Sequence, residues 1–141
     1  MRISIKVLPQ ENILEVIPLM MEYKKGKVPQ HILEERFLDM ATQNYECAVM
    51  YDSDKLIGIA GMWFMTRHYS GKSMEPDHVY IANGYRGKGL GKQFFDWMHN
   101  YARSKGCQSS ELNTYVQNYP SHKFYYNEGY EIYGYHFFKT L

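Results

Sequence analysis

The sequence predicts a mixed α/β fold (α+β in some classifications), in a single domain that spans residues 1–141. Segments with alternating apolar residues, typical of strands, are interspersed with segments of helical periodicity, in the order β-α-α-β-β-β-α-β-α-β. A chain of 141 residues is a normal length for one domain and can bury a core without a disulfide or a metal. No internal repeat or low-complexity linker divides it.

The first half of the chain is predicted to form a strand, two helices and a hairpin. Pro9 ends the first alternating segment, and Gly26 and Pro29 separate two amphipathic segments. The turn sequence Asp52-Ser53-Asp54 joins two apolar runs, the second of which is long enough for a central strand. The expected elements are strands at 3–7, 45–51 and 56–65, and helices at 11–23 and 32–40.

The second half alternates strands and helices. One strand is expected to begin only after Pro76. A glycine-rich segment then leads into a helix, and Gly106 stands where a C-terminal helix cap is expected. The last expected strand places Tyr133, Tyr135 and Phe137 on one face, either as an acceptor wall or as a dimer surface. The expected elements are a loop at 67–72, strands at 78–81, 110–116 and 131–138, and helices at 92–105 and 121–127.

Charge and composition exclude several classes of protein. Sixteen Lys and Arg against fifteen Asp and Glu argue against nucleic acid or a membrane as a partner. No apolar run approaches the roughly 20 residues that cross a bilayer, and the N-terminus lacks a signal-peptide core, so we expect a cytoplasmic protein. Cys47 and Cys107 match no metal-binding spacing. Reduced thiols are the favoured interpretation, with a disulfide left open.

The most informative stretch is Tyr85-Arg86-Gly87-Lys88-Gly89-Leu90-Gly91-Lys92, between a predicted strand and a predicted helix. Glycines let backbone N–H groups approach a ligand, because no Cβ blocks them. The following helix N-terminus adds unpaired donors and partial positive charge. The stretch therefore predicts a pyrophosphate cradle.

Two common phosphate motifs fit this stretch poorly. The P-loop motif needs Ser or Thr after Gly91-Lys92, and Gln93 stands there. The dinucleotide-binding motif needs a third glycine where Lys92 stands, and no second nucleotide-binding half follows.

The same stretch resembles the central motif of the GNAT superfamily of acetyl-CoA-dependent N-acetyltransferases, R/Q-x-x-G-x-G/A, with Arg86, Gly89 and Gly91 in the named positions. Further along, Asn118, Ser121, Phe124-Tyr125 and Gly129-Tyr130 resemble the family's second motif. The sequence departs from the family pattern at three positions, which are Asn83, Ser121 and Glu128.

The resemblance implies a GNAT-like, mostly antiparallel central sheet flanked by about four helices. It also implies acetyl-CoA as cosubstrate, no metal, and direct acetyl transfer in a ternary complex. By resemblance, the strand backbone and Asn118 hold the pantetheine arm, and the loop holds the pyrophosphate. The cofactor-binding residues expected in this way are Tyr80, Ile81, Asn83, Arg86, Gly87, Lys88, Gly89, Leu90, Gly91, Lys92 and Asn118.

Transfer to an amine requires a proton acceptor for the ammonium and a proton donor for the leaving thiolate. Tyr125 occupies the family's general-acid position. The candidate bases are Glu75, Asp77 and His78, near the strand that precedes the loop, and the sequence does not choose among them. Simple alternation along that strand predicts that Asp77 and His78 face opposite ways.

The acceptor is expected to be a small molecule with a primary amine, because the chain has no acidic excess to attract basic peptides or polyamines. A homodimer is compatible with the aromatic C-terminal segment. An alternative function for the same fold is that of a catalytically silent module that binds CoA or acyl-CoA.

Overall fold

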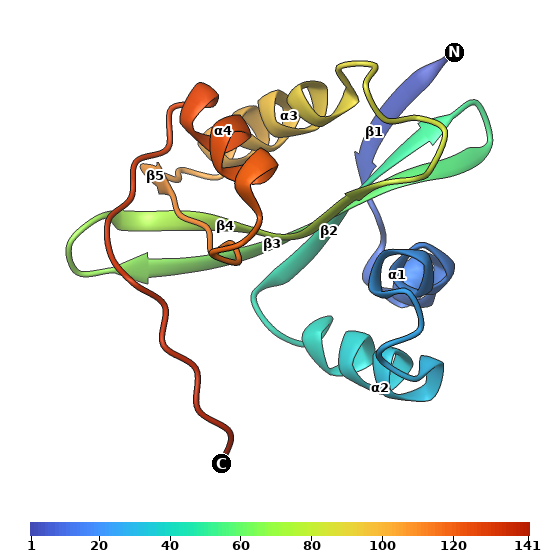
Figure 1. Ribbon diagram of the computed structural model, residues 1–141, viewed down its shortest axis with the longest axis horizontal. Coiled ribbons are helices and arrows are strands. Elements are labelled where there is room, and N and C mark those ends of the chain that lie inside the picture. The colour runs from blue at the N-terminus through green and yellow to red at the C-terminus, as the bar shows by residue number, and fades with distance from the viewer.

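The computed structural model describes residues 1–141 and contains one five-stranded sheet in the order β1-β2-β3-β4-β5 (Figure 1). The first four strands pair antiparallel, whereas the short β5 pairs parallel to β4. The expected mostly antiparallel mixed sheet is therefore confirmed. The strands are β1 (Ile3–Val7), β2 (Tyr45–Asp52), β3 (Lys55–Arg67), β4 (Gly71–Ile81) and β5 (Ser109–Ser110).

Helices cover both faces of the sheet. α1 and α2 lie on one side and α3 and α4 on the other (Figure 1). Between them they close a core of buried apolar side chains, among which Val16, Met50, Ile59 and Phe94 have no exposed surface. The helices are α1 (Ile17–Lys24), α2 (Gln30–Met40), α3 (Leu90–Ser104) and α4 (Tyr119–Asn127).

The expected helix over residues 11–23 is divided in two. A 3-10 helix, η1 (Gln10–Val16), precedes α1, and Pro18 stands in the first turn of α1. Proline fits there because the N–H groups of the first turn have no acceptor within the helix, so the N–H that proline lacks is not needed. At the other end of the fold, Gly106 follows α3 with a φ of +84°, so the expected glycine cap is confirmed.

β4 begins earlier than the sequence predicted. Pro76 lies inside the strand, opposite Met62 of β3, and the residues before it continue the ladder back to Gly71. Pairing with β5 ends at Met74, so a residue without an N–H removes no hydrogen bond on that side of β4. The expected loop over residues 67–72 therefore shrinks to the turn between β3 and β4.

Two strand predictions near the C-terminus were wrong. The strand expected at 110–116 is limited to Ser109–Ser110, because the chain pulls away from β4 after Glu111. The strand expected at 131–138 is absent, and the chain follows an extended path toward the C-terminus there (Figure 1). This segment makes no backbone hydrogen bond, and an alternating pattern forms a strand only where a second segment pairs with it.

Two further features bear on the sequence expectations. Cys47 and Cys107 are free thiols, the first buried and the second partly exposed. None of the helices combines the length and hydropathy needed to cross a membrane.

Candidate active site

A cleft of about 1300 Å³ opens where α1 and α2 face the end of β4, the loop before α3 and the start of α4. It brings together residues from both halves of the chain. Of the predicted site residues, the cleft is lined by Asp77, His78, Tyr80, Ile81, Asn83, Arg86, Gly87, Gly89, Leu90, Gly91, Asn118 and Tyr125. Glu75, Lys88 and Lys92 do not line it.

The loop before α3 presents a continuous row of backbone donors. The seven successive N–H groups of residues 86–92 donate to no acceptor in the protein. Gly87 and Gly89 adopt φ values of +73° and +76°, which other residues rarely adopt, and a Cβ at either position would meet nothing within 4 Å. This geometry suits the phosphate oxygens of a diphosphate, because such oxygens accept several N–H bonds at once.

Lys92 points away from this cradle. Its Nζ lies 3.2 Å from Oδ1 of Asp96, one turn along α3, and 3.5 Å from Oε2 of Glu128. These ion pairs give Lys92 a structural role at the junction of α3 and α4, where Glu128 departs from the family pattern.

Arg86 folds back over the end of β4. Its guanidinium lies 5.0 Å from the centre of the Tyr80 ring, and its Nε donates to the carbonyl of Ile81 at 3.3 Å. The arginine is thus held beside the strand backbone, within the same cleft as the glycine loop. A cation stacked on an aromatic face keeps its charge available to an anion.

Glu22 of α1 is a site residue that the sequence did not reveal. Its Oε2 accepts a hydrogen bond from the Tyr80 hydroxyl at 2.6 Å and from the backbone N–H of Asn83 at 3.2 Å. Burial, followed by this carboxylate, raises the pKa of Tyr80. The backbone donor that the family resemblance assigns to the cosubstrate is therefore occupied by a side chain.

Tyr125 stands on α4 and faces the cleft. It packs against Phe95 and Tyr130, and burial raises the pKa of its hydroxyl, as does the nearby Tyr23. The hydroxyl therefore stays protonated at neutral pH and can donate a proton. Tyr23, which stacks on Tyr80 at 5.0 Å, is a second cleft tyrosine whose pKa is raised, chiefly by burial.

A bulge in β4 decides where His78 points. Ile59 pairs with Tyr80 and Gly61 with Asp77, so the single residue between them on β3 faces both His78 and Val79. His78 takes a φ of +38°, unusual for a residue other than glycine. Asp77 and His78 consequently both line the cleft, and the expectation that they face opposite ways was wrong.

The His78 ring is fixed on one side and free on the other. Its Nε2 lies 2.5 Å from the Tyr45 hydroxyl, and Phe37 of α2 meets the ring edge-on. Its Nδ1 is shielded from solvent and has no hydrogen-bond partner. Burial lowers the pKa of His78, partly offset by the Asp77 carboxylate, so the ring is neutral at pH 7.

The two carboxylates proposed as bases are engaged elsewhere. Asp77 accepts hydrogen bonds from the indole of Trp63 at 3.0 Å and from the N–H of His78 at 2.8 Å. Glu75 accepts from Arg67 and from the Asn113 amide, both at 3.2 Å. Burial raises the pKa of Glu75, with Arg67 opposing, but its carboxylate lies outside the cleft.

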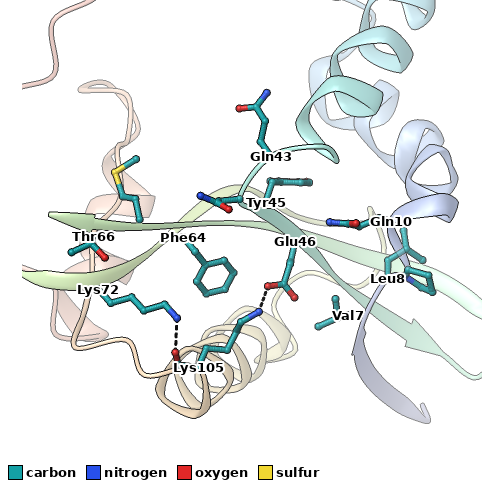
Figure 2. Close-up of a pocket in the computed structure, with 13 residues that line it drawn as sticks. Val7, Leu8, Gln10, Gln43, Tyr45, Glu46, Phe64, Thr66, Lys72 and Lys105 are labelled. Atoms are coloured by element: carbon teal, nitrogen blue, oxygen red, sulfur yellow. Dashed lines mark hydrogen bonds and ion pairs between the residues drawn. The ribbon is translucent and has the colours of Figure 1, made fainter.

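A second hollow of about 610 Å³ lies near the C-terminal end of α3 (Figure 2). Its charged groups are partnered within the protein. Glu46 is bound by Lys105 and by the Tyr101 hydroxyl, and Lys72 donates to the backbone carbonyl of Lys105 at 2.6 Å. With no free donor or acceptor of this kind, the hollow lacks the chemistry of the larger cleft.

Most of the chain matches a known protein family. The sequence profile described as the Acetyltransferase (GNAT) family matches residues 13–130, which include both the glycine loop and Tyr125. The chain belongs to the GNAT acetyltransferase family. The GNAT resemblance of the two motifs is thereby confirmed.

Individual relatives of this GNAT chain are distant. Aminoalkylphosphonate N-acetyltransferase of Salmonella typhimurium (strain LT2) is 23% identical over 133 residues, covering 93% of this chain and 86% of that protein. Ribosomal-protein-alanine N-acetyltransferase of Brucella melitensis biovar Abortus 2308 has a TM-score of 0.82 at 17% identity, with full coverage of both chains. AAC(6')-Iy, in complex with a bisubstrate analogue that contains CoA, has a TM-score of 0.82 at 15% identity, covering 100% of this chain and 99% of that one. These structures share the GNAT fold.

Proposed function

We propose that this GNAT protein transfers an acetyl group from acetyl-CoA to the primary amine of a small acceptor, directly within a ternary complex. One observation supports the proposal above the others. The loop with the free backbone donors, of which residues 86, 87 and 89–91 line the cleft, shares that cleft with a protonated tyrosine and a neutral histidine. Diphosphate binding, thiolate protonation and amine deprotonation each need one of these three features.

The residues fit the cosubstrate in a simple division of roles. The amides of residues 86–92 and the Arg86 guanidinium would hold the diphosphate. The backbone of Tyr80, Ile81 and Asn83, with Asn118 opposite, would hold the pantetheine arm. Glu22 and Arg86 currently occupy Asn83 N–H and Ile81 C=O, so binding requires these side chains to release them.

We assign the proton acceptor to His78. When its proton resides on Nε2, donated to the Tyr45 oxygen, Nδ1 has a lone pair that no protein group uses. This atom is shielded from solvent, so binding of the acceptor must expose it before it takes the ammonium proton, directly or through one water. The amine nitrogen then attacks the thioester carbon, and the C–S bond breaks. Asp77 raises the basicity of the ring, whereas its own two oxygens already accept hydrogen bonds.

Tyr125 supplies the proton that the departing thiolate needs. Its raised pKa keeps the hydroxyl protonated until a thiolate forms beside it. The thiolate forms only as the C–S bond breaks, and its thiol has a pKa of about 8.5, below that of the Tyr125 hydroxyl. The hydroxyl therefore first stabilises the thiolate by donating a hydrogen bond, and proton transfer to sulfur is completed as solvent reprotonates the tyrosine.

The acceptor half of the cleft suggests an amine that also has an anionic group. Lys24 at the end of α1, Lys25 just after it and Arg36 of α2 line it, and none of the three forms an ion pair. The relative from Salmonella is named for an aminoalkylphosphonate, which joins an amine to a dianion through a short linker. An aminoalkylphosphonate is therefore the first acceptor to test.

The experiment combines calorimetry with acetyl-CoA and a thiol-release assay over a panel of acceptors. The panel pairs an aminoalkylphosphonate with the plain alkylamine of equal chain length and adds an aminoglycoside. We expect acetyl-CoA binding, and faster thiol release with the phosphonate than with its matched amine. Failure to bind acetyl-CoA would contradict the proposal. Binding with no thiol release from any amine would instead support a silent CoA-binding module.

A further inference from the structure

Tyr45, the first residue of β2, is 1% exposed, and its hydroxyl lies 2.5 Å from Nε2 of His78. Other rings fix its position, since Trp63 packs against it at 4.9 Å and Phe37 meets it edge-on at 6.4 Å. Burial, followed by the Cys47 thiol, raises the pKa of the hydroxyl, so the hydroxyl keeps its proton at neutral pH. The partner of the histidine ring is therefore a neutral hydroxyl held in one place.

Two arrangements of protons satisfy the contact between Tyr45 and His78, because a hydroxyl can both donate and accept. If the hydroxyl donates to Nε2, the ring proton must sit on Nδ1. If Nε2–H donates to the hydroxyl oxygen, Nδ1 keeps a lone pair. Only the second arrangement gives His78 a free lone pair on the nitrogen that no protein group uses.

Cys47 distinguishes the two arrangements. It stands two residues after Tyr45 in β2, so the two side chains lie on the same face of the sheet. Its thiol is hydrogen-bonded to the Tyr45 hydroxyl, and its own proton is donated to the carbonyl of Ala48, 3.6 Å from Sγ. The Cys47 sulfur is therefore available as the acceptor for the Tyr45 proton.

The count of hydrogen bonds favours a proton on Nε2. In that arrangement the ring N–H donates to Tyr45, the Tyr45 hydroxyl donates to Cys47, and the thiol donates to Ala48, so every proton has an acceptor. In the reverse arrangement the bond between Tyr45 and Cys47 loses its proton, and Nδ1–H is left without an acceptor where solvent does not reach it. A buried donor without an acceptor destabilises the arrangement that contains it.

We propose that Tyr45 is a positioning residue that, together with Cys47, fixes the proton of His78 on Nε2 and reserves the lone pair on Nδ1 for the acceptor ammonium. The step at the ammonium rests on the proposed function, whereas the place of the ring proton does not. In that step the N–H bond of the ammonium breaks, a bond to Nδ1 forms, and the ring becomes an imidazolium until it loses a proton to water. The Tyr45 oxygen accepts from Nε2 before and after the transfer, so the chain of hydrogen bonds needs no rearrangement.

The direct test is NMR of the histidine ring nitrogens in the full-length protein at about pH 8, where an ordinary histidine is neutral. A protonated and an unprotonated ring nitrogen differ widely in chemical shift. Among the six histidines, the signals of His78 are those that His78→Gln removes. We expect a proton on Nε2 and none on Nδ1. A proton on Nδ1 in the wild type would overturn the proposal.

Cys47→Ala removes the acceptor of the Tyr45 proton, so the hydroxyl should turn to Nε2 and the ring proton of His78 should move to Nδ1. Thiol release should then slow at least about tenfold in kcat, toward the loss of about 10²–10⁴ that removal of a general base causes. Acetyl-CoA affinity should not change. Cys47→Ser restores an acceptor and should restore both the tautomer and most of kcat. Cys107→Ala removes the other free thiol and is the matched control, with wild-type tautomer and rate.

Tyr45→Phe removes the hydroxyl and should leave His78 with a mixture of both tautomers. The wild-type tautomer in either Cys47→Ala or Tyr45→Phe would overturn the proposal, even with a lower kcat, because the loss would then come from packing. The expected tautomers in every variant, with no thiol release from any acceptor, would support the place of the ring proton and contradict the proposed function alone.

Discussion

The imidazole of His78 occupies the space that a side chain at position 61 would need. A Cβ on Gly61 would overlap Nε2 of this ring, and His78 belongs to the bulge in β4 that faces this part of β3. The glycine at position 61, the bulge and the positive φ of His78 therefore depend on one another. Together they turn a strand residue inward, toward Tyr45 and the cleft.

Gly61→Ala should displace the His78 ring. The methyl group would meet three ring atoms, and the ring has Tyr45 and Phe37 on its other sides, so it must shift or rotate. Misplacing a reacting group by about 1 Å costs up to about 10²-fold in rate. We expect kcat to fall by about that factor in the thiol-release assay. Calorimetry should show unchanged acetyl-CoA affinity, and a normal kcat would refute the role of His78.

The pH profile distinguishes His78 from its neighbours. Because burial lowers its pKa below the ordinary 6.5, kcat of the wild type should level off already in weakly acidic solution. In His78→Gln only pre-deprotonated amine can react, so kcat should keep rising toward the amine pKa, near about 10.4. Rates of thiol release measured from about pH 5 to about pH 10, a range that spans the ordinary pKa values of histidine and of an alkylamine, provide the comparison.

Asp77→Asn is the matched variant. Removing the carboxylate that raises the His78 pKa should move the acidic limb to lower pH while leaving the plateau in place. A variant that loses the plateau would assign the proton acceptor to Asp77 instead.

Local signals in the sequence were sufficient for most of the fold and half of the site. The glycine loop and Tyr125 were found because each belongs to a contiguous motif between a strand and a helix. The bulge at His78 was missed, since alternation along a strand contains no mark for an inserted residue. The predicted start of β4 was wrong for a similar reason. Pro76 is tolerated inside the strand because β5 ends before it, and the sequence around Pro76 does not show where β5 ends.

Glu22 illustrates the limit more sharply. It lies 61 residues before Asn83, in a helix whose other residues look like ordinary packing, and only the folded chain brings the two together. The strand expected at 131–138 was wrong because an alternating pattern does not show whether a second segment pairs with it.

Glu22→Ala should strengthen acetyl-CoA binding. The carboxylate now holds the N–H of Asn83 and places a negative charge beside a polyanionic ligand, so its removal frees a donor and lowers repulsion. A hydrogen bond to a charged group contributes about 1.5–3 kcal/mol, so a gain of roughly tenfold in affinity is expected by calorimetry. Glu11→Ala removes the same charge outside the cleft and is the control. Equal gains in acetyl-CoA affinity in the two variants would mean that the gain comes from the change in net charge alone.

Arg86→Ala should weaken acetyl-CoA binding by about 1–3 kcal/mol, the range for a charge-assisted hydrogen bond. Its guanidinium already lies in the cleft above Tyr80. Dephospho-CoA, which lacks the 3′-phosphate, is the matched ligand. If Arg86 binds the diphosphate, the mutation should weaken the binding of dephospho-CoA as much as that of the full cosubstrate. A loss confined to the full cosubstrate would assign Arg86 to the 3′-phosphate, and no loss would mean that the amides of residues 86–92 suffice.

Tyr125→Phe removes one hydroxyl and keeps the ring against Phe95 and Tyr130. If this hydroxyl protonates the thiolate, kcat should fall by about 10²–10⁴, the usual contribution of a positioned general acid. Acetyl-CoA affinity should change little, since a single neutral hydrogen bond contributes about 1 kcal/mol.

The neighbouring residue provides the control for Tyr125. Tyr126 is exposed and lies about 100° around the same helix, so Tyr126→Phe should leave kcat unchanged. Parallel losses of rate and affinity in Tyr125→Phe would reassign the hydroxyl to holding the cosubstrate. An unchanged kcat would leave Tyr23 as the candidate donor, because it is a partly buried tyrosine of the cleft whose hydroxyl, unlike that of Tyr80, donates to no carboxylate. The double variant Tyr23→Phe with Tyr125→Phe would then lose the activity that either single variant keeps.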